Sequence, residues 1–323
     1  MVLNIIFSFN RAMQLDHLLR SILENHKIDY KIIVLYHTTG NHREGYEIVK
    51  KKYRNSENFS FIERKPTLLD VSCLSSVKNT SDFKFFVKHS RLFDKNSDNF
   101  KSLLEKILKK SDCEFIMFNT DDGYFFDHLI IDEDVFSLIR NNPENVSYRA
   151  YVGENLEHFP SYVKRWGNHY LWDYFRDKNV THWSYNFAID ATVYHRETLL
   201  RLLRKVPYHN PVSLEANVEG YCRRKGYFGI GLGPVTSKVV GTLLNQVSKA
   251  INNPTIDINP KTLNDYFIKG FSLKLKLTPQ IDKVNLVPEE VKVYNDVEEK
   301  IIYTLNESGR EIQKKFGIKG TEL

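Results

Sequence analysis

The stretch that decides the fold class is LNIIFSFNRAMQLDHLLRSILENHKIDYKIIVLY, residues 3–36. Residues 3–9 and 30–36 are two apolar runs, each of a length typical of a strand that is buried on both faces. Between them, residues 15–26 place leucine and isoleucine at helical spacing. Strand, helix and strand over this distance make a βαβ unit, which predicts a parallel sheet with helices on its faces.

The same alternation continues along the chain. Further strands are predicted at 59–64, 113–119 and 146–152, and further helices at 42–55, 98–110, 132–143, 197–206, 210–226 and 259–271. Residues 70–95 are predicted to form a helix plus loop, and the aromatic, polar stretch 160–195 to form loops and a strand. After about residue 280 the sequence is richer in charge and shows no clear sheet pattern. A mostly helical extension is therefore expected there.

Composition limits the classes of function. The net charge of +6 favours an anionic ligand or an anionic membrane surface, but it is too diffuse for nucleic-acid binding. The three cysteines, Cys73, Cys113 and Cys222, lie far apart without metal-binding spacing, which indicates reduced thiols in a cytoplasmic protein. The opening MVLNIIFSFN resembles a strand rather than a signal peptide, and no transmembrane segment is expected.

An acidic doublet is the first candidate functional site. The apolar run FIMFNTDDGYFF, residues 115–126, stops at Asp121 and Asp122. One interpretation is a turn, in which Gly123 takes a positive φ. The other is a Mg²⁺ or Mn²⁺ site, because hard oxygen ligands at the carboxyl end of a parallel strand suit such an ion and a phosphate-bearing substrate. The two can coexist, and the strand-end position favours the metal.

Five segments carry a resemblance to a known family. In chain order they are FSFNRAMQLDHLLRSI (7–22), FNTDDGYFF (118–126), WSYNFAIDATVYHRETLL (183–200), NPVSLEANV (210–218) and TLNDYFIKGF (262–271). Together they resemble nucleotide-sugar-dependent glycosyltransferases of GT-A fold, near the inverting family 2 group. The resemblance implies a Rossmann-like α/β glycosyltransferase domain over residues 1–275, with residues 276–323 as the mostly helical extension.

On the donor side, the resemblance implies a nucleoside diphosphate sugar held with Mg²⁺ or Mn²⁺. Asp122 is then the expected metal ligand, and Asp121 is expected to touch ribose or the water shell of the metal. Asn10 and Arg11 belong to the loop that begins the nucleotide pocket, although Arg11 is equally compatible with a solvated surface position. Lys238 is a candidate contact to the diphosphate.

On the acceptor side, an inverting transfer needs a base that takes the proton of the attacking hydroxyl. The resemblance places that base at Glu215, with Glu219 in reserve. A first-turn acid that interacts with the helix dipole is an equally good interpretation of Glu215. Asp190 is expected to orient an acceptor hydroxyl or to cap a strand. Trp183 and Tyr185 are candidates for stacking on a saccharide or glycolipid acceptor.

Two departures from the family pattern keep alternatives open. Gly123 stands where the family often has a further acid, and YHTTG (36–40) lacks the aspartate that many relatives place near the nucleotide base. A non-catalytic sugar- or nucleotide-binding protein on the same fold is one alternative. A nucleotidyltransferase is less favoured, because no glycine-rich, basic triphosphate loop follows the first strand. Association with a membrane periphery stays open.

Overall fold

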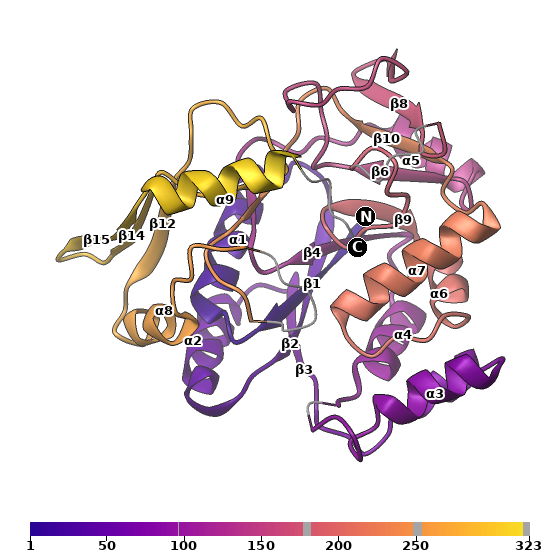
Figure 1. The fold of residues 1–323 in the computed structure, drawn as a ribbon, viewed down its shortest axis with the longest axis horizontal. Coiled ribbons are helices and arrows are strands. Elements are labelled where there is room, and N and C mark those ends of the chain that lie inside the picture. The colour runs from indigo at the N-terminus through magenta and orange to yellow at the C-terminus, as the bar shows by residue number, and fades with distance from the viewer. Residues whose placement is uncertain (96, 177–181, 248–253, 319–323) are drawn as a thin grey trace.

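A computed structural model describes residues 1–95, 97–176, 182–247 and 254–318 (Figure 1). The strands are β1 (Val2–Phe9), β2 (Tyr30–His37), β3 (Phe59–Glu63), β4 (Phe115–Thr120), β5 (Gly123–Phe125), β6 (Val146–Arg149), β7 (Lys164–Trp166), β8 (His169–Asp173), β9 (Thr192–His195), β10 (Ile230–Pro234), β11 (Val239–Thr242), β12 (Ser272–Lys276), β13 (Asn285–Leu286), β14 (Glu290–Tyr294) and β15 (Glu299–Thr304). The helices are α1 (Ala12–Asn25), η1 (Gly40–His42), α2 (Arg43–Tyr53), η2 (Val71–Ser76), α3 (Thr80–Lys88), α4 (Phe100–Lys110), α5 (Glu133–Asn141), α6 (Arg196–Leu203), α7 (Pro211–Lys225), α8 (Pro260–Ile268) and α9 (Glu307–Ile318).

The centre of the molecule is a large sheet. Its strand order is β3-β2-β1-β4-β9-β6-β10-β8-β7, and all of these strands except β8 and β9 run in one direction. Helices cover the sheet, as Figure 1 shows. The predicted α/β class with a mostly parallel central sheet is therefore confirmed.

The predicted βαβ unit is β1, α1 and β2. β1 pairs in parallel with β2 on one side and with β4 on the other, so it is an interior strand. Leu3, Ile5 and Phe7 of β1 belong to the hydrophobic core on one face of the sheet. Val2 and Ile6 belong to the core on the other face. Burial on both faces explains why this strand is an almost continuous apolar run.

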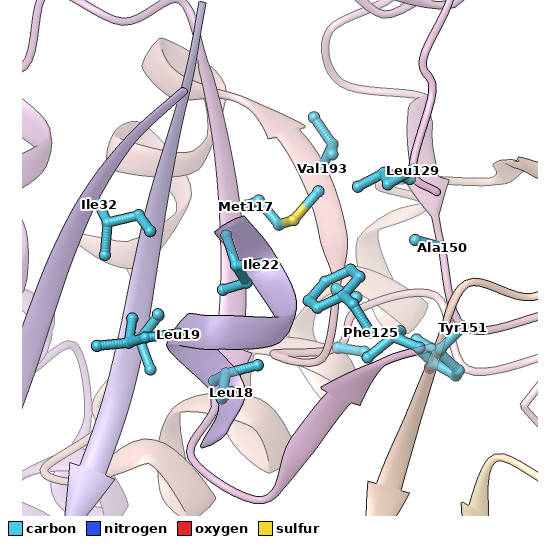
Figure 2. Packing of buried hydrophobic residues seen from close by; sticks show 14 of the residues in the cluster. Leu18, Leu19, Ile22, Ile32, Met117, Phe125, Leu129, Ala150, Tyr151 and Val193 are labelled. Atoms are coloured by element: carbon cyan, nitrogen blue, oxygen red, sulfur yellow. The ribbon is translucent and has the colours of Figure 1, made fainter. Parts of the chain in front are cut away.

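Helix α1 packs through its apolar stripe. Figure 2 shows Leu18, Leu19 and Ile22 beside the strands, with Met117 of β4 and Phe125 of β5 in the same cluster. Leu18, Leu19 and Ile22 are fully buried, and each such side chain stabilises the fold by roughly 1.5–3 kcal/mol. This packing holds the loop between β1 and α1 at the edge of the sheet where β4 ends.

The prediction of a mostly helical extension at 276–323 is wrong. Three strands, β13, β14 and β15, follow residue 284, and α9 is the one helix among the described residues of this segment. β12, β14 and β15 form a three-stranded antiparallel sheet. Val291 and Val293 of β14 are buried, while the intervening Lys292 is only half-buried. This period of two is a strand signal, but it was hidden because charged residues occupy the outer positions.

The domain boundary predicted at residue 275 falls inside β12. That strand is attached to the first helix of the fold, because Nη2 of Arg20 donates a hydrogen bond to the carbonyl oxygen of Leu273 at 2.7 Å. Buried Leu273 also belongs to the same hydrophobic core as α1. The C-terminal strands are therefore part of the main body.

Two further properties concern the chain as a whole. Cys73, Cys113 and Cys222 are buried free thiols. Among the helices of the described residues, none combines the length and apolar character that crossing a membrane requires.

Candidate active site

The carboxyl ends of β1 and β4 lie side by side. Phe7 of β1 is paired with Thr120 of β4, and the backbone N–H of Asp121 donates to the carbonyl oxygen of Phe7 at 3.1 Å. The loop that starts at Asn10 and the acidic doublet therefore meet at one edge of the sheet, as the parallel pairing requires. This is the edge at which open α/β sheets bind ligands.

Asp121 is held by three donors. Its Oδ1 accepts from Nη1 of Arg11 at 2.9 Å, and its Oδ2 accepts from Ser8 Oγ at 2.8 Å and from the backbone N–H of Phe9 at 3.0 Å. Only 4% of the residue is exposed. Because both carboxylate oxygens of Asp121 accept hydrogen bonds and the residue is buried, Asp121 joins the ends of β1 and β4. The contact with ribose or with the water shell of a metal that was expected of Asp121 stays a prediction.

Arg11 is the cation between the two carboxylates. The same Nη1 also donates to Oδ2 of Asp122 at 3.0 Å, and Nε donates to Oδ1 of Asn245 at 2.9 Å. Nη2 donates to the backbone oxygen of Asn245. The Arg11 side chain is 8% exposed. It is therefore a buried link across the strand ends, which rules out a solvated surface position. The expected contact of Arg11 with the nucleotide stays a prediction.

Asp122 differs from its neighbour. Its side chain is 33% exposed, and among the described residues its Oδ1 receives no hydrogen bond. Its backbone oxygen accepts from the N–H of Thr242 at 2.9 Å and from the hydroxyl at 2.8 Å, which fixes the carboxylate at the turn. Mg²⁺ commonly binds through one or two carboxylates together with substrate phosphates and water. The residue present fits that mode of binding.

The turn at the doublet is present, but Gly123 does not have the positive φ that was expected. It is the first residue of β5 and pairs with Gly241 of β11. A Cβ at Gly123 would lie 3.3 Å from the backbone oxygen of Thr120. Close packing rather than a left-handed backbone therefore favours glycine here.

Asp190 reaches the same edge from the opposite direction. β9 runs antiparallel to β4, with Thr192 opposite Phe118, so the residues before β9 lie beside the end of β4. The hydroxyl of Thr120 donates to Oδ1 of Asp190 at 2.7 Å. Ala191 has a φ of 38°, which is the left-handed region that non-glycine residues rarely adopt. Such strain is common at functional sites.

Glu215 is brought to Asp190 by α7. The helix starts with a capping box, in which Asn210 accepts from the N–H of Ser213 and the Ser213 hydroxyl accepts from the N–H of Asn210. Glu215 then accepts the backbone N–H of Ile189 at 3.1 Å through Oε1. Its carboxyl group is thus joined to the residue that precedes Asp190.

The pKa values of both acids are raised. Burial, and then the charge of Asp190, raises the pKa of Glu215 to about 8. Burial, and then the charge of Asp122, raises the pKa of Asp190 to about 6. Asp190 is an exposed residue, although enough protein surrounds its carboxyl group to raise its pKa. The pair can therefore exchange a proton with a bound hydroxyl near neutral pH.

Arg149 is a residue that the sequence analysis missed. Its guanidinium is buried and donates to the backbone oxygens of His182 and Tyr185. It lies over the rings of Tyr151 and Tyr174, with centroid distances of 4.9 and 5.0 Å. Its charge lowers the pKa of both acids of the pair. The available signal was an arginine within the apolar and aromatic run of residues 146–152.

Trp183 is not positioned to stack on a sugar. It is 1% exposed, its Nε1–H donates to the backbone oxygen of His158 at 2.8 Å, and its ring packs edge-on against Trp172 at 4.9 Å. The expected acceptor contact is therefore corrected to core packing. Tyr185 is half-buried, and within the described part of the chain its buried hydroxyl has no partner. Burial, and then the charge of Glu215, raises the pKa of Tyr185.

The remaining two candidates have partners of their own. Asn10, with a φ of 53°, accepts from the N–H of Thr39 and donates to its hydroxyl, both at 2.9 Å. It thereby joins the loops that follow β1 and β2. Lys238 forms an ion pair with Asp127. Any contact of Lys238 with a diphosphate would first have to open that pair.

Comparisons with known proteins give distant structural neighbours only. No protein-family model and no curated protein matches the chain. The crystal structure of S. aureus TarS aligns with 13% identity, over 83% of this chain and 38% of that chain, at a TM-score of 0.44. S. aureus TarS 1–349 in complex with UDP-GlcNAc aligns with 13% identity, over 83% of this chain and 70% of that chain, at a TM-score of 0.42. An active-site mutant of LgtC aligns with 12% identity, over 62% of this chain and 59% of that chain, at a TM-score of 0.32.

This chain thus spans well under half of the length of the full TarS chain. Likeness at this level assigns neither a family nor an activity.

Proposed function

We propose that the protein is a glycosyltransferase that moves a sugar from a nucleoside diphosphate sugar to a hydroxyl of a saccharide or glycolipid acceptor, with inversion. The observation that carries the proposal is the row of three acids at one edge of the sheet. Asp122 has a carboxylate oxygen that accepts no hydrogen bond from the described residues and that suits a divalent ion. Near it, the acids Asp190 and Glu215 have raised pKa values.

On the donor side, Asp122 would hold Mg²⁺ or Mn²⁺ together with oxygens of the diphosphate. A bound ion of this kind stabilises the negative charge that develops on the departing diphosphate. Among the described residues, one group of three side chains lies close enough together to hold a metal ion, namely His89, Asp94 and His209. Asp122 does not belong to this group. Binding at Asp122 would therefore depend on the substrate's own oxygens.

On the acceptor side, Glu215 acts as the base. Its carboxylate takes the proton from the acceptor hydroxyl while the hydroxyl oxygen attacks the anomeric carbon. The bond from that carbon to the diphosphate oxygen breaks, and its electron pair leaves with the nucleoside diphosphate. Asp190 stabilises the proton on Glu215 through its negative charge, and Arg149 prevents the pKa from rising further.

Release of nucleoside diphosphate from a panel of nucleotide sugars, with Mn²⁺ and with or without saccharide acceptors, tests the proposal. We expect turnover of at least one donor, loss of turnover on chelation, and loss in Asp122→Asn. The matched variant is Asp127→Asn, an acid near the doublet in sequence that pairs with Lys238 instead.

Full turnover by Asp122→Asn in the presence of chelator would eliminate the metal assignment. Donor binding without any release of nucleoside diphosphate would favour the non-catalytic alternative.

A further inference from the structure

Residues 66–98 form an excursion between β3 and α4, called here the 66–98 excursion. The two ends of the excursion lie side by side, because Pro66 and Asp98 form an antiparallel bridge and the N–H of Asn99 donates to the carbonyl oxygen of Lys65 at 3.1 Å. It contains η2 and α3, and Figure 1 shows α3 at the periphery of the molecule, beyond α4. The described residues of this excursion contribute no strand to the central sheet.

The inner face of the excursion is attached to the body. Phe86 of α3 is buried, and Asp70 accepts the N–H of Ser102 in α4 at 2.9 Å. His89 stacks on His209, with ring centroids 3.6 Å apart and planes at 15°. His209 immediately precedes the residue that caps α7. The excursion therefore rests on α4 and on the start of the helix that carries Glu215.

The outer face of the excursion is apolar to an unusual degree. Six of the twelve large apolar side chains that are exposed in the described chain lie within residues 68–93. They are Leu68, Val71, Leu74, Phe83, Leu92 and Phe93, each at least 50% exposed. The N–H of Arg91 donates to the carbonyl oxygen of Leu68 at 2.9 Å, so the segments around Leu68 and Leu92 lie together. Half of the large apolar side chains that are exposed in the described chain thus lie in this one segment, and exposed apolar surface that gathers in one place marks a site of interaction.

Cationic side chains accompany the apolar ones. The exposed cations from residue 65 to residue 95 are Lys65, Lys78, Lys84, Lys88, Arg91 and Lys95. Among the described residues, none of these six side chains has an ion-pair partner. The same stretch has three acids, Asp70, Asp82 and Asp94, and Asp70 is buried. The surface is thus both apolar and positively charged.

We infer that the outer face of the 66–98 excursion docks on the surface of an anionic lipid bilayer. Exposed leucine and phenylalanine enter the headgroup region, and the lysines meet the negative surface potential. A protein partner fits less well, because protein interfaces are depleted in lysine and enriched in arginine. Here five of the six cations are lysine.

Docking of this face would also orient the molecule. Phe85 and His89 of the excursion contact His209, so the start of α7 lies next to the docked segment. Under the proposed function, that arrangement brings the acceptor side of the site near lipid, where a glycolipid hydroxyl would be presented. The docking itself does not depend on glycosyl transfer, and it is measured without donor or acceptor.

Co-sedimentation of the full chain with vesicles tests the inference. We expect binding to vesicles of phosphatidylcholine with phosphatidylglycerol, weaker binding as salt increases, and little binding to phosphatidylcholine alone. Lys84→Gln with Lys88→Gln should weaken binding by roughly fivefold for each lysine removed. Leu92→Asp with Phe93→Asp should abolish it, while circular dichroism and the melting temperature stay unchanged, because both side chains are exposed.

The matched controls lie outside the excursion. Val297→Asp with Ile301→Asp changes two exposed apolar residues of the C-terminal strand region, and Lys51→Gln with Lys225→Gln removes two exposed lysines. Both controls should bind as the unchanged chain does. Equal losses in controls and excursion variants, or no vesicle binding at all, would overturn the inference. So would a dimer in light scattering that Leu92→Asp with Phe93→Asp converts to monomer, since the patch would then be a protein interface.

Discussion

Two acidic clusters lie at the same edge of the sheet, and they differ in how their charges are balanced. Asp121 is buried with Arg11 and two further donors, so its charge is matched and both oxygens are used. The carboxyl groups of Asp190 and Glu215 each accept one hydrogen bond from the described residues, and among those residues neither has an ion-pair partner. Burial raises the pKa of all three acids. The clusters therefore differ in their ion pairs, because the neighbours rather than the residue type decide whether the charge of a carboxyl group is balanced.

The two clusters differ in whether an ion pair balances the charge of the carboxyl groups. The Arg11 and Asp121 cluster joins β1, β4 and the segment around Asn245, and it stabilises the edge. Burial opposes the ionisation of Asp121 as well as that of Asp190 and Glu215, but of these three acids only Asp121 has an ion-pair partner within the described residues. Acids whose pKa is raised and whose charge is not balanced by an ion pair are candidates for chemistry.

The largest effect is expected from removing the proton acceptor. Glu215→Gln should lower turnover by about 10²–10⁴-fold with donor binding intact, because general-base catalysis contributes on that order. Glu219→Gln is the control, since Glu219 lies one turn later and pairs with Arg223. Steady-state assays with donor binding by calorimetry provide the measurement. An active Glu215→Gln enzyme would remove Glu215 from the role of base.

Changes in the Arg11 and Asp121 cluster should lower the free energy of unfolding. Arg11→Met leaves Asp121 buried without its cation, and we expect a loss of about 3–5 kcal/mol in the free energy of unfolding. Adding Asp121→Asn should recover part of that loss, because the uncompensated charge is then gone. Urea unfolding of the two single variants and the double variant gives the coupling. Additive losses would show that the two side chains do not stabilise each other.

The smallest effect is a shift in pH dependence. The proposed base works when ionised, so activity should rise with pH as Glu215 loses its proton near its raised pKa of about 8. Asp190→Asn removes a negative charge that holds this pKa up, and the acidic limb of the rate profile should move down by about one pH unit. Profiles of kcat/KM for both forms measure the shift. An unmoved limb would mean that the two acids are not coupled.

Much of the sheet edge that carries Asp121 and Asp122 could be predicted from the sequence. The apolar runs of β1 and β4 and the helical spacing of α1 place residues 10, 11, 121 and 122 at strand ends, and parallel pairing brings those ends together. The start of α7 could also be predicted, because asparagine is a typical capping residue and proline a typical first residue of a helix, as Asn210 and Pro211 are here. The strand runs, the helical spacing and the helix cap all depend on residues that lie within a few positions of one another in the sequence.

The sequence by itself therefore determined the α/β class, the strand-end position of the acidic doublet and the helix that carries Glu215. Only the tertiary structure decided that Arg11 balances Asp121, that Trp183 lies in the core, and that the chain after β12 continues as strands. It also decided that Asp190 lies close enough to Glu215 for its charge to raise the pKa of Glu215. Helix and strand formation follows local periodicity, whereas burial, charge balance and pKa depend on side chains that are distant in the sequence and meet only when the sheet and its helices assemble.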